Sequence, residues 1–265
     1  MMHQSPGLLS QRLGHILQHE HAVSHVRGRA KDIRLWIADA TAKERSRARD
    51  VTNRLLAGVD PDDRKAIVAK SRRQTLHPSQ VLFRTGERAE QLFVLRKGRV
   101  QFGRLSSTGR EVVMGILGPG DVLGLACLLP SSNHIGTAEA LDRGEVQVWS
   151  RHVIQRFAHK FPQVQGNVLQ VALGYVAEFA DRIEKLASGT AEQRLSHALT
   201  SLAVRIGTTS HTSIDILIKN EQLASLADVS PFTVSRLLKQ WERAGVISKS
   251  RGIVRILSPE NLLLG

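Results

Sequence analysis

The sequence predicts an α+β protein: an N-terminal antiparallel β barrel or sandwich, then one long helix, then a C-terminal winged helix-turn-helix domain. Three observations lead to this expectation. Residues 75–150 carry short strand-like runs between turn signals. Residues 162–187 carry an apolar stripe at helical spacing. Residues 219–247 have the pattern of two short helices joined by a tight turn.

The β-rich segment is defined by short runs of β-branched and aromatic residues. These runs cover 81–83, 91–95, 99–102, 111–117 and 145–149. Turn signals separate them, among them Lys97-Gly98 and Gly118-Pro119-Gly120-Asp121. Short strands at this spacing are typical of an antiparallel barrel or sandwich.

The long helix is expected to begin at Pro162, where a missing backbone N–H costs nothing. Its apolar residues recur at steps of three and four: Val168, Ala172, Tyr175, Phe179, Ile183 and Leu186. Such a narrow, long stripe predicts a partner helix, and we expect it to form the seam of a homodimer. The alternative is that the stripe packs back on its own β domain.

The helix-turn-helix pattern centres on Ser230-Pro231, which suits the N-cap and first position of a second helix. A small shared core is predicted from Leu223, Leu226, Val234, Leu237 and Leu238. Hydroxyls and cations are left to face outward, which suits the major groove of DNA. The alternative is a plain helical hairpin with solvated cations. The residues that we expect to meet DNA here are Lys219, Asn220, Ser230, Phe232, Thr233, Ser235, Arg236 and Lys239.

A possible wing follows at residues 246–256, where two β-rich runs flank a turn that contains Gly252. Lys249 and Arg251 lie near its tip and could contact phosphate. Such contacts supply affinity and register but carry no base information.

Bulk composition narrows the classes of partner. The formal net charge of +13 over 265 residues indicates a polyanionic partner, although charge alone does not separate nucleic acid from an anionic membrane. No apolar run is long enough to cross a membrane, and the first residues lack the pattern of a secretion signal. We therefore expect a cytoplasmic protein with double-stranded DNA as its partner and no membrane.

Metal and cluster chemistry has little support. Cys127 is the only cysteine, which excludes an intrachain disulfide and an iron–sulfur cluster held by the cysteines of one chain. Residues 1–50 carry several histidines: His15, His19, His21 and His25. His15 and His19 lie one helical turn apart, which raises a metal hypothesis. A solvated helix with incidental histidines is favoured, because no further ligand set lies nearby.

The order of these parts resembles the catabolite-activator/fumarate-nitrate-regulator (CRP/FNR) family of bacterial transcription factors, over roughly residues 55–258. The residues that carry the resemblance include Gly86-Glu87, Lys97-Gly98, Gly118-Pro119-Gly120-Asp121-Val122-Leu123-Gly124 and Thr233-Val234-Ser235-Arg236-Leu237-Leu238. The resemblance implies an N-terminal jelly-roll sensor domain, a dimerisation helix, and a homodimer that binds a palindromic promoter site and RNA polymerase. The expected division is a helical extension at 1–50, the sensor domain at 51–161, the helix at 162–187 and the DNA-binding domain at 188–265.

The family's cyclic-nucleotide members hold ribose with a Gly-Glu pair and phosphate with an Arg. Here the matching positions are Gly124-Leu125 and His134, followed by Ile135 and Thr137. Leucine accepts no hydrogen bond and neutral imidazole is a poor phosphate clamp, so cyclic AMP in the usual mode is not expected. The open alternatives are a regulator that needs no ligand, another second messenger, or haem on His134, His77 or an N-terminal histidine.

The recognition helix also departs from the family pattern. Many relatives present a Glu three residues before the Ser-Arg pair, where it reads cytosine, and here that position is Phe232. Phenylalanine could touch a thymine methyl instead, or simply pack. Arg236 keeps its place and is the expected contact to guanine or phosphate.

Two other classes of protein are alternatives to a transcription regulator: an enzyme and a DNA-coating scaffold. No phosphate loop, Gly-x-Ser-x-Gly elbow or paired metal-ligand signature supports an enzyme whose β domain is regulatory. A basic scaffold that coats DNA without reading it is the other rival. We therefore expect no catalytic residues and no metal site, and the sequence leaves the effector and the sign of regulation open.

Overall fold

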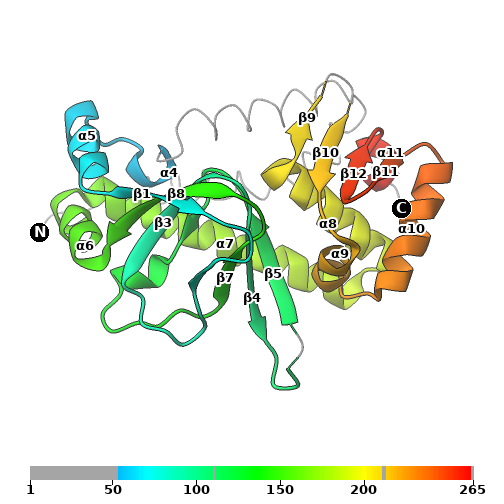
Figure 1. Cartoon of the computed structure of the whole chain (residues 1–265), viewed down its shortest axis with the longest axis horizontal. Helices are drawn as coiled ribbons and strands as arrows, with labels where there is room; N and C mark the ends of the chain where they lie inside the picture. The colour runs from blue at the N-terminus through cyan, green and yellow to red at the C-terminus, as the bar shows by residue number, and fades with distance from the viewer. Residues whose placement is uncertain (1–52, 110, 211–212, 264–265) are drawn as a thin grey trace, which may run out of the picture.

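The computed structural model describes residues 53–109, 111–210 and 213–263. The predictions for the histidines of residues 1–50 lie outside the described residues. Figure 1 shows a β-sandwich and a C-terminal domain at the two ends of the molecule, connected by the long helix α7 (Pro162–Ser188). This α+β arrangement confirms the predicted fold class.

The β-sandwich consists of two antiparallel four-stranded sheets. One sheet has the order β1 (Arg72–Leu76), β8 (Gly144–Ser150), β3 (Gln91–Lys97) and β6 (Val122–Leu123). The other has the order β2 (Val81–Phe83), β7 (Thr137–Ala140), β4 (Val100–Leu105) and β5 (Glu111–Leu117). Inward-facing residues such as Leu95, Val100 and Val146 are fully buried between them, as expected for two sheets packed face to face.

Short helices close one side of the sandwich. They are α4 (Asn53–Leu56), α5 (Pro61–Ala69), η1 (Leu125–Leu128) and α6 (Arg151–Lys160). Together with the first half of α7 they bury a second core around Trp149 and Ile154. The Trp149 indole donates a 2.9 Å hydrogen bond to the Ile67 carbonyl, which fixes α5 on β8.

The C-terminal domain is a winged helix-turn-helix, as predicted. Its elements are α8 (Ala191–Ile206), β9 (Thr208–Thr209), β10 (Ile214–Leu217), α9 (Asn220–Ala227), α10 (Pro231–Arg243), β11 (Ile247–Ser250), β12 (Ile253–Ile256) and α11 (Pro259–Leu263). The predicted core residues of α9 and α10 are all buried. Val113 and Ile116 of β5 belong to the same core cluster, so the domain packs directly on the sandwich.

Helix α7 has two apolar faces, and this corrects part of the predicted seam. Val168 and Tyr175 pack against the chain's own core, and the Tyr175 hydroxyl donates to the Val122 carbonyl and accepts from its amide. For these two residues the alternative, packing back on the β domain, is the correct one. The exposed large apolar residues of α7 are Leu169, Leu173, Val176 and Ile183. Of the helices in the described part of the chain, none combines the length and apolar character that a bilayer span requires.

Candidate nucleic-acid interface

The turn between α9 and α10 is held by capping and by a neighbouring helix. Helix α9 ends at Asp228, which adopts a left-handed conformation with φ of 47°. The Ser230 hydroxyl accepts the Thr233 amide at 3.0 Å and caps α10, as the sequence predicted. From α8, Arg194 donates to the carbonyls of Ala227 and Asp228. The start of α10 is therefore rigidly placed.

The two sides of α10 differ sharply. Val234, Leu237, Leu238 and Trp241 face the core of the domain. The opposite side carries an exposed row, here called the outer stripe, at positions i, i+4, i+7 and i+11: Phe232, Arg236, Lys239 and Arg243. Within the part of the chain that the structure describes, these cations form no ion pair, so their charge is available to an anionic partner. Arg243 was not selected from the sequence, although its spacing four residues after Lys239 could have indicated it.

The hydroxyls predicted to face outward have partners inside the domain. The Thr233 hydroxyl lies 2.9 Å from that of Ser230. The Ser235 hydroxyl accepts a 2.9 Å bond from the Asn220 side chain and joins α10 to α9. Both residues are only partly exposed. Ser235 thus links the two helices, whereas Thr233 supports the cap of α10.

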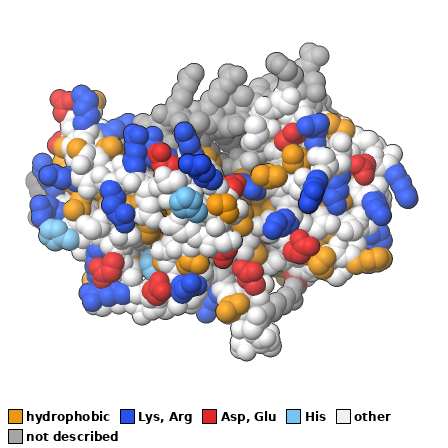
Figure 2. Space-filling view, viewed as in Figure 1, with side chains coloured by type: hydrophobic (Ala, Val, Ile, Leu, Met, Phe, Trp, Pro, Cys, Tyr) orange, Lys and Arg blue, Asp and Glu red, His pale blue; other side chains and the backbone are white. Residues whose placement is uncertain are grey.

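The wing extends the cationic surface beyond α10. Lys249 and Arg251 are exposed on the β11–β12 hairpin, and the Lys249 amide donates to Glu242 at the end of α10 at 2.9 Å. Lys219 is exposed at the N-cap of α9. Figure 2 shows Lys and Arg side chains gathered on the outer side of the C-terminal domain, over the region of α10 and the wing in Figure 1.

The predicted sensor positions lie in the sandwich and do not converge on one polar site. Gly124 has φ of 77°, and a Cβ added there would lie 2.3 Å from the Gln91 carbonyl oxygen, so a close approach requires glycine. Leu125 packs against the helical core. Ile135 is 65% exposed, and the Thr137 hydroxyl accepts the Thr85 amide at 3.1 Å. Ile135 therefore does not belong to the interior of the sandwich, and its place in a sensor pocket stays a prediction.

His134 is buried in an aromatic cluster. It is 6% exposed, and its ring stacks on Phe83 with centroids 3.7 Å apart and an interplanar angle of 11°. Phe83 contacts Phe93 and Phe102 in turn. Burial lowers the pKa of His134, against a smaller opposing effect of Glu87, and so favours the neutral imidazole. His134 is therefore part of the packed interior of the sandwich.

Comparisons with known proteins agree with this architecture. A family model described as a cyclic nucleotide-binding domain matches residues 73–161. A model described as a Crp-like helix-turn-helix domain matches residues 193–264. The chain belongs to the CRP/FNR family. That family consists of DNA-binding transcription regulators, and not of enzymes.

Several relatives within the family are distant. Regulatory protein HlyX of Actinobacillus pleuropneumoniae is 21% identical over 179 residues, or 67% of this chain and 74% of that protein. The cyclic AMP receptor protein of Thermus thermophilus is 25% identical over 202 residues, or 76% of this chain and 91% of that protein. The solved structure of FixK2 from Bradyrhizobium japonicum has a TM-score of 0.66 at 21% identity, covering 72% of this chain and 95% of that one.

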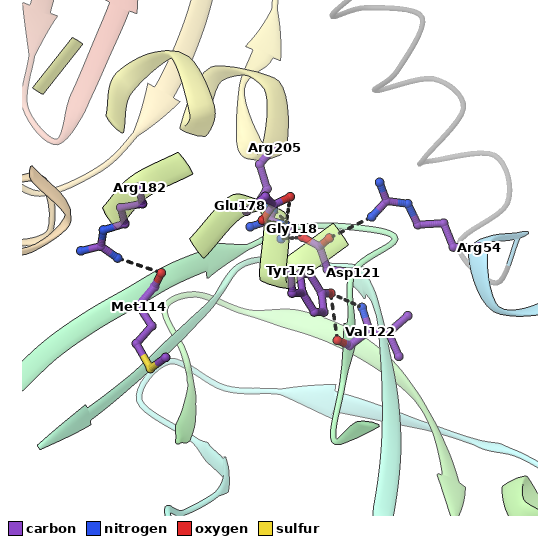
Figure 3. A network of polar contacts seen from close by, with 9 residues as sticks. All are labelled: Arg54, Met114, Gly118, Asp121, Val122, Tyr175, Glu178, Arg182 and Arg205. Carbon is purple, nitrogen blue, oxygen red and sulfur yellow. Dashed lines mark hydrogen bonds and ion pairs between the residues drawn. The ribbon is translucent and has the colours of Figure 1, made fainter. Parts of the chain in front are cut away.

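In this CRP/FNR-family chain, Arg205 of α8 joins the DNA-binding domain to the sandwich (Figure 3). Its guanidinium lies 3.2 Å from Asp121 and 2.7 Å from Glu178 of α7. Asp121 is 2% exposed and also accepts the Gly118 amide at 2.8 Å. Burial alone would lower the pKa of Arg205, but the two carboxylates outweigh burial and raise it, so the guanidinium stays charged.

Arg182 of α7 makes a second joint, also visible in Figure 3. It donates to the carbonyls of Val113 and Met114 on β5, each at 2.9 Å, and to the Ser225 carbonyl on α9 at 3.0 Å. Figure 3 shows the bond to Met114. The Val113 amide donates in turn to the Ser225 hydroxyl at 2.9 Å. Helix α9 is thereby bonded to the edge strand of the sandwich as well as to α7.

Sequence reasoning did not select either arginine. Arg182 and Arg205 lie within helices whose main sequence signal is the spacing of their apolar residues. Asp121 was noticed only as part of a turn. A signal did exist, because a carboxylate next to a buried strand requires a cationic partner.

Proposed function

We propose that this chain is a homodimeric, sequence-specific regulator that places two α10 helices in successive major-groove faces of a palindromic promoter site. The single observation that carries this proposal is the outer stripe: exposed cations on a capped helix whose other side is fully buried. Recognition helices of dimers must reach grooves roughly 34 Å apart. We further propose that it acts in the cytoplasm and contacts RNA polymerase at its promoters.

The exposed face of α7 supports the dimer. Leu169, Leu173, Val176 and Ile183 are between 43% and 65% exposed, and exposed Ala180 fills the gap between Val176 and Ile183. Their steps of four and three residues match the a and d positions of a coiled coil. We propose that this row forms the seam, with Ala172, Phe179 and Leu186 at its flanks, in place of a seam that includes Val168 and Tyr175.

The seam can be tested by a charge placed within it. Val176→Glu should convert a dimer into a monomer, because paired carboxylates would be buried across the two-fold axis. Leu129→Glu is the matched control, since Leu129 is 59% exposed but lies outside α7. Light scattering on the full chain measures both. An unchanged dimer for Val176→Glu rejects the proposed seam.

Sequence-specific DNA binding can be tested through Arg236. If Arg236 reads a base, Arg236→Ala should weaken specific binding by about 1–3 kcal/mol at one base pair and relax the preference there. An equal loss on all sequences would assign it to phosphate alone. Displacement by random competitor DNA as easily as by any selected site would favour the scaffold that coats DNA without reading it.

The sensor positions support a regulator that does not use cyclic AMP in the usual mode. Leu125 faces the helical core, and His134 is stacked within the aromatic cluster. Among the alternatives to cyclic AMP, this packing favours a regulator that needs no ligand over one that binds haem or another second messenger. An absorption spectrum and an analysis of extracted small molecules decide between them. A Soret band would indicate haem, a bound nucleotide would indicate a second messenger, and neither would favour ligand independence.

A further inference from the structure

Phe232 is the most exposed large hydrophobic side chain that the structure describes, at 79%. It lies at the second position of α10, directly after Pro231. The sequence left two possibilities open for this phenylalanine, a contact with DNA or simple packing. Its exposure excludes packing within the chain, because the core side of α10 is already occupied by Val234, Leu237 and Leu238.

The position of Phe232 matters more than its exposure, since single exposed apolar residues are common on protein surfaces. Phe232 heads the outer stripe, one helical turn before Arg236. The N-terminal residues of a recognition helix are those that reach base edges in the major groove. The capped first turn, with Ser230 bonded to the Thr233 amide, fixes the backbone that carries the ring.

We propose that Phe232 is a specificity-determining residue that reads thymine through its C5-methyl group. A phenyl ring has no donor or acceptor, so it cannot read a base edge by conventional hydrogen bonding. The thymine methyl is the apolar group that a base pair presents in the major groove. Wedge insertion between base steps is the less suitable alternative, because it is characteristic of minor-groove binders. This inference rests on the proposed DNA-reading function and names the base that it selects.

The spacing of the stripe limits where this thymine lies. Four residues of α-helix advance about 6 Å, and one base pair advances about 3.4 Å along each strand. The base that Phe232 contacts should therefore lie within about two base pairs of the position whose preference is relaxed by Arg236→Ala. A thymine selected at that place in each half-site is the expected signature.

The decisive experiment removes one methyl group from the DNA. The full-length protein first selects its operator from a random duplex pool. Each thymine of one half-site is then replaced by deoxyuridine, which differs from thymine only by the methyl. We expect one position at which the affinity falls about fourfold, the effect of one buried methyl. In Phe232→Ala the same replacement should have no effect.

Matched variants separate base reading from general affinity. Lys239→Ala should weaken binding but keep the fourfold penalty of deoxyuridine. Phe232→Leu should keep part of that penalty, because it retains an apolar side chain. Phe232→Glu should move the preference at this position from thymine to cytosine, since a carboxylate accepts from cytosine N4. Far-ultraviolet circular dichroism checks that each variant is folded.

The inference is overturned if no deoxyuridine replacement weakens the wild-type complex, or if Phe232→Ala suffers the same penalty as the wild type. Either result leaves the proposed regulator intact, because an operator would still have been selected. Failure to select any operator would instead reject the proposed function itself. These two failures are therefore distinguishable in one series of measurements.

Discussion

The outer stripe and the sensor positions respond in opposite ways to the same kind of sequence change. In both regions the family resemblance led us to expect an apolar or weakly polar residue where many relatives carry a charged one. Phe232 is left exposed on a rigid helix, whereas Leu125 and His134 are absorbed into packed interiors. Loss of a charge at an exposed position alters what the protein can read. Inside the sandwich, the residues at the corresponding positions contribute to packing instead.

Arg205 joins the two domains that carry these regions, and its removal should have the largest effect. Arg205→Met leaves Asp121, which is 2% exposed, without its close cationic partner. We expect a loss of about 3 kcal/mol in the free energy of unfolding, because the buried carboxylate then keeps only the more distant Arg54, 3.6 Å away, as a cationic partner. Urea denaturation measures the change. The double variant Asp121→Asn/Arg205→Met should recover part of the loss, and no recovery would mean that the ion pair is not the cause.

Because His134 is buried and Phe232 is exposed, His134→Ala should lower the stability of the protein and Phe232→Ala should not. His134→Ala removes a ring stacked on Phe83 inside the sandwich, and should cost about 2 kcal/mol through lost contacts and a cavity. Phe232→Ala should change the free energy of unfolding by no more than about 0.5 kcal/mol, since its side chain is solvated. Thermal denaturation of both variants tests this. Equal costs would show that the two regions do not differ as described.

The burial of His134 should make the free energy of unfolding depend on pH. Because burial lowers the pKa of His134 below its ordinary value of 6.5, the unfolded chain binds the proton more readily than the folded one. The free energy of unfolding should therefore fall as the pH drops below that value, and be fully retained above it. His134→Phe should reduce this slope. A residual slope is expected from His197, whose pKa burial also lowers.

Local patterns were sufficient for most of the fold. The capped α10 and the buried core of Leu223, Val234 and Leu238 follow from spacing and capping residues alone. Strand β1 was not predicted, because its residues, Arg72–Leu76, are mostly polar and exposed. It is defined by pairing with β8, which a single segment does not reveal.

The functional regions were harder to predict because they, too, depend on which distant segments pack together. Helix α7 has one apolar face toward the sandwich and one toward solvent, and the sequence stripe mixed the two by joining Tyr175 to Ile183. Spacing identifies an apolar stripe but not the partner that covers it. The pairing of Asp121 with Arg205 depends on how distant segments meet, which no local signal encodes. The exposure of Phe232 likewise became clear only once the neighbouring helix was in place.

The smallest expected effect comes from a substitution in the wing. It separates contacts that depend on the DNA sequence from contacts with the phosphate backbone. Lys249 and Arg251 lie on a hairpin beside α10, and the contacts that we propose for them are with phosphate and not with base edges. Lys249→Ala should weaken binding about equally on all sequences and reduce the slope of log affinity against log salt by about one. A salt titration on the selected operator and on random DNA measures both quantities. If the loss is confined to the operator, the wing reads sequence, and the division of roles between the outer stripe and the wing is wrong.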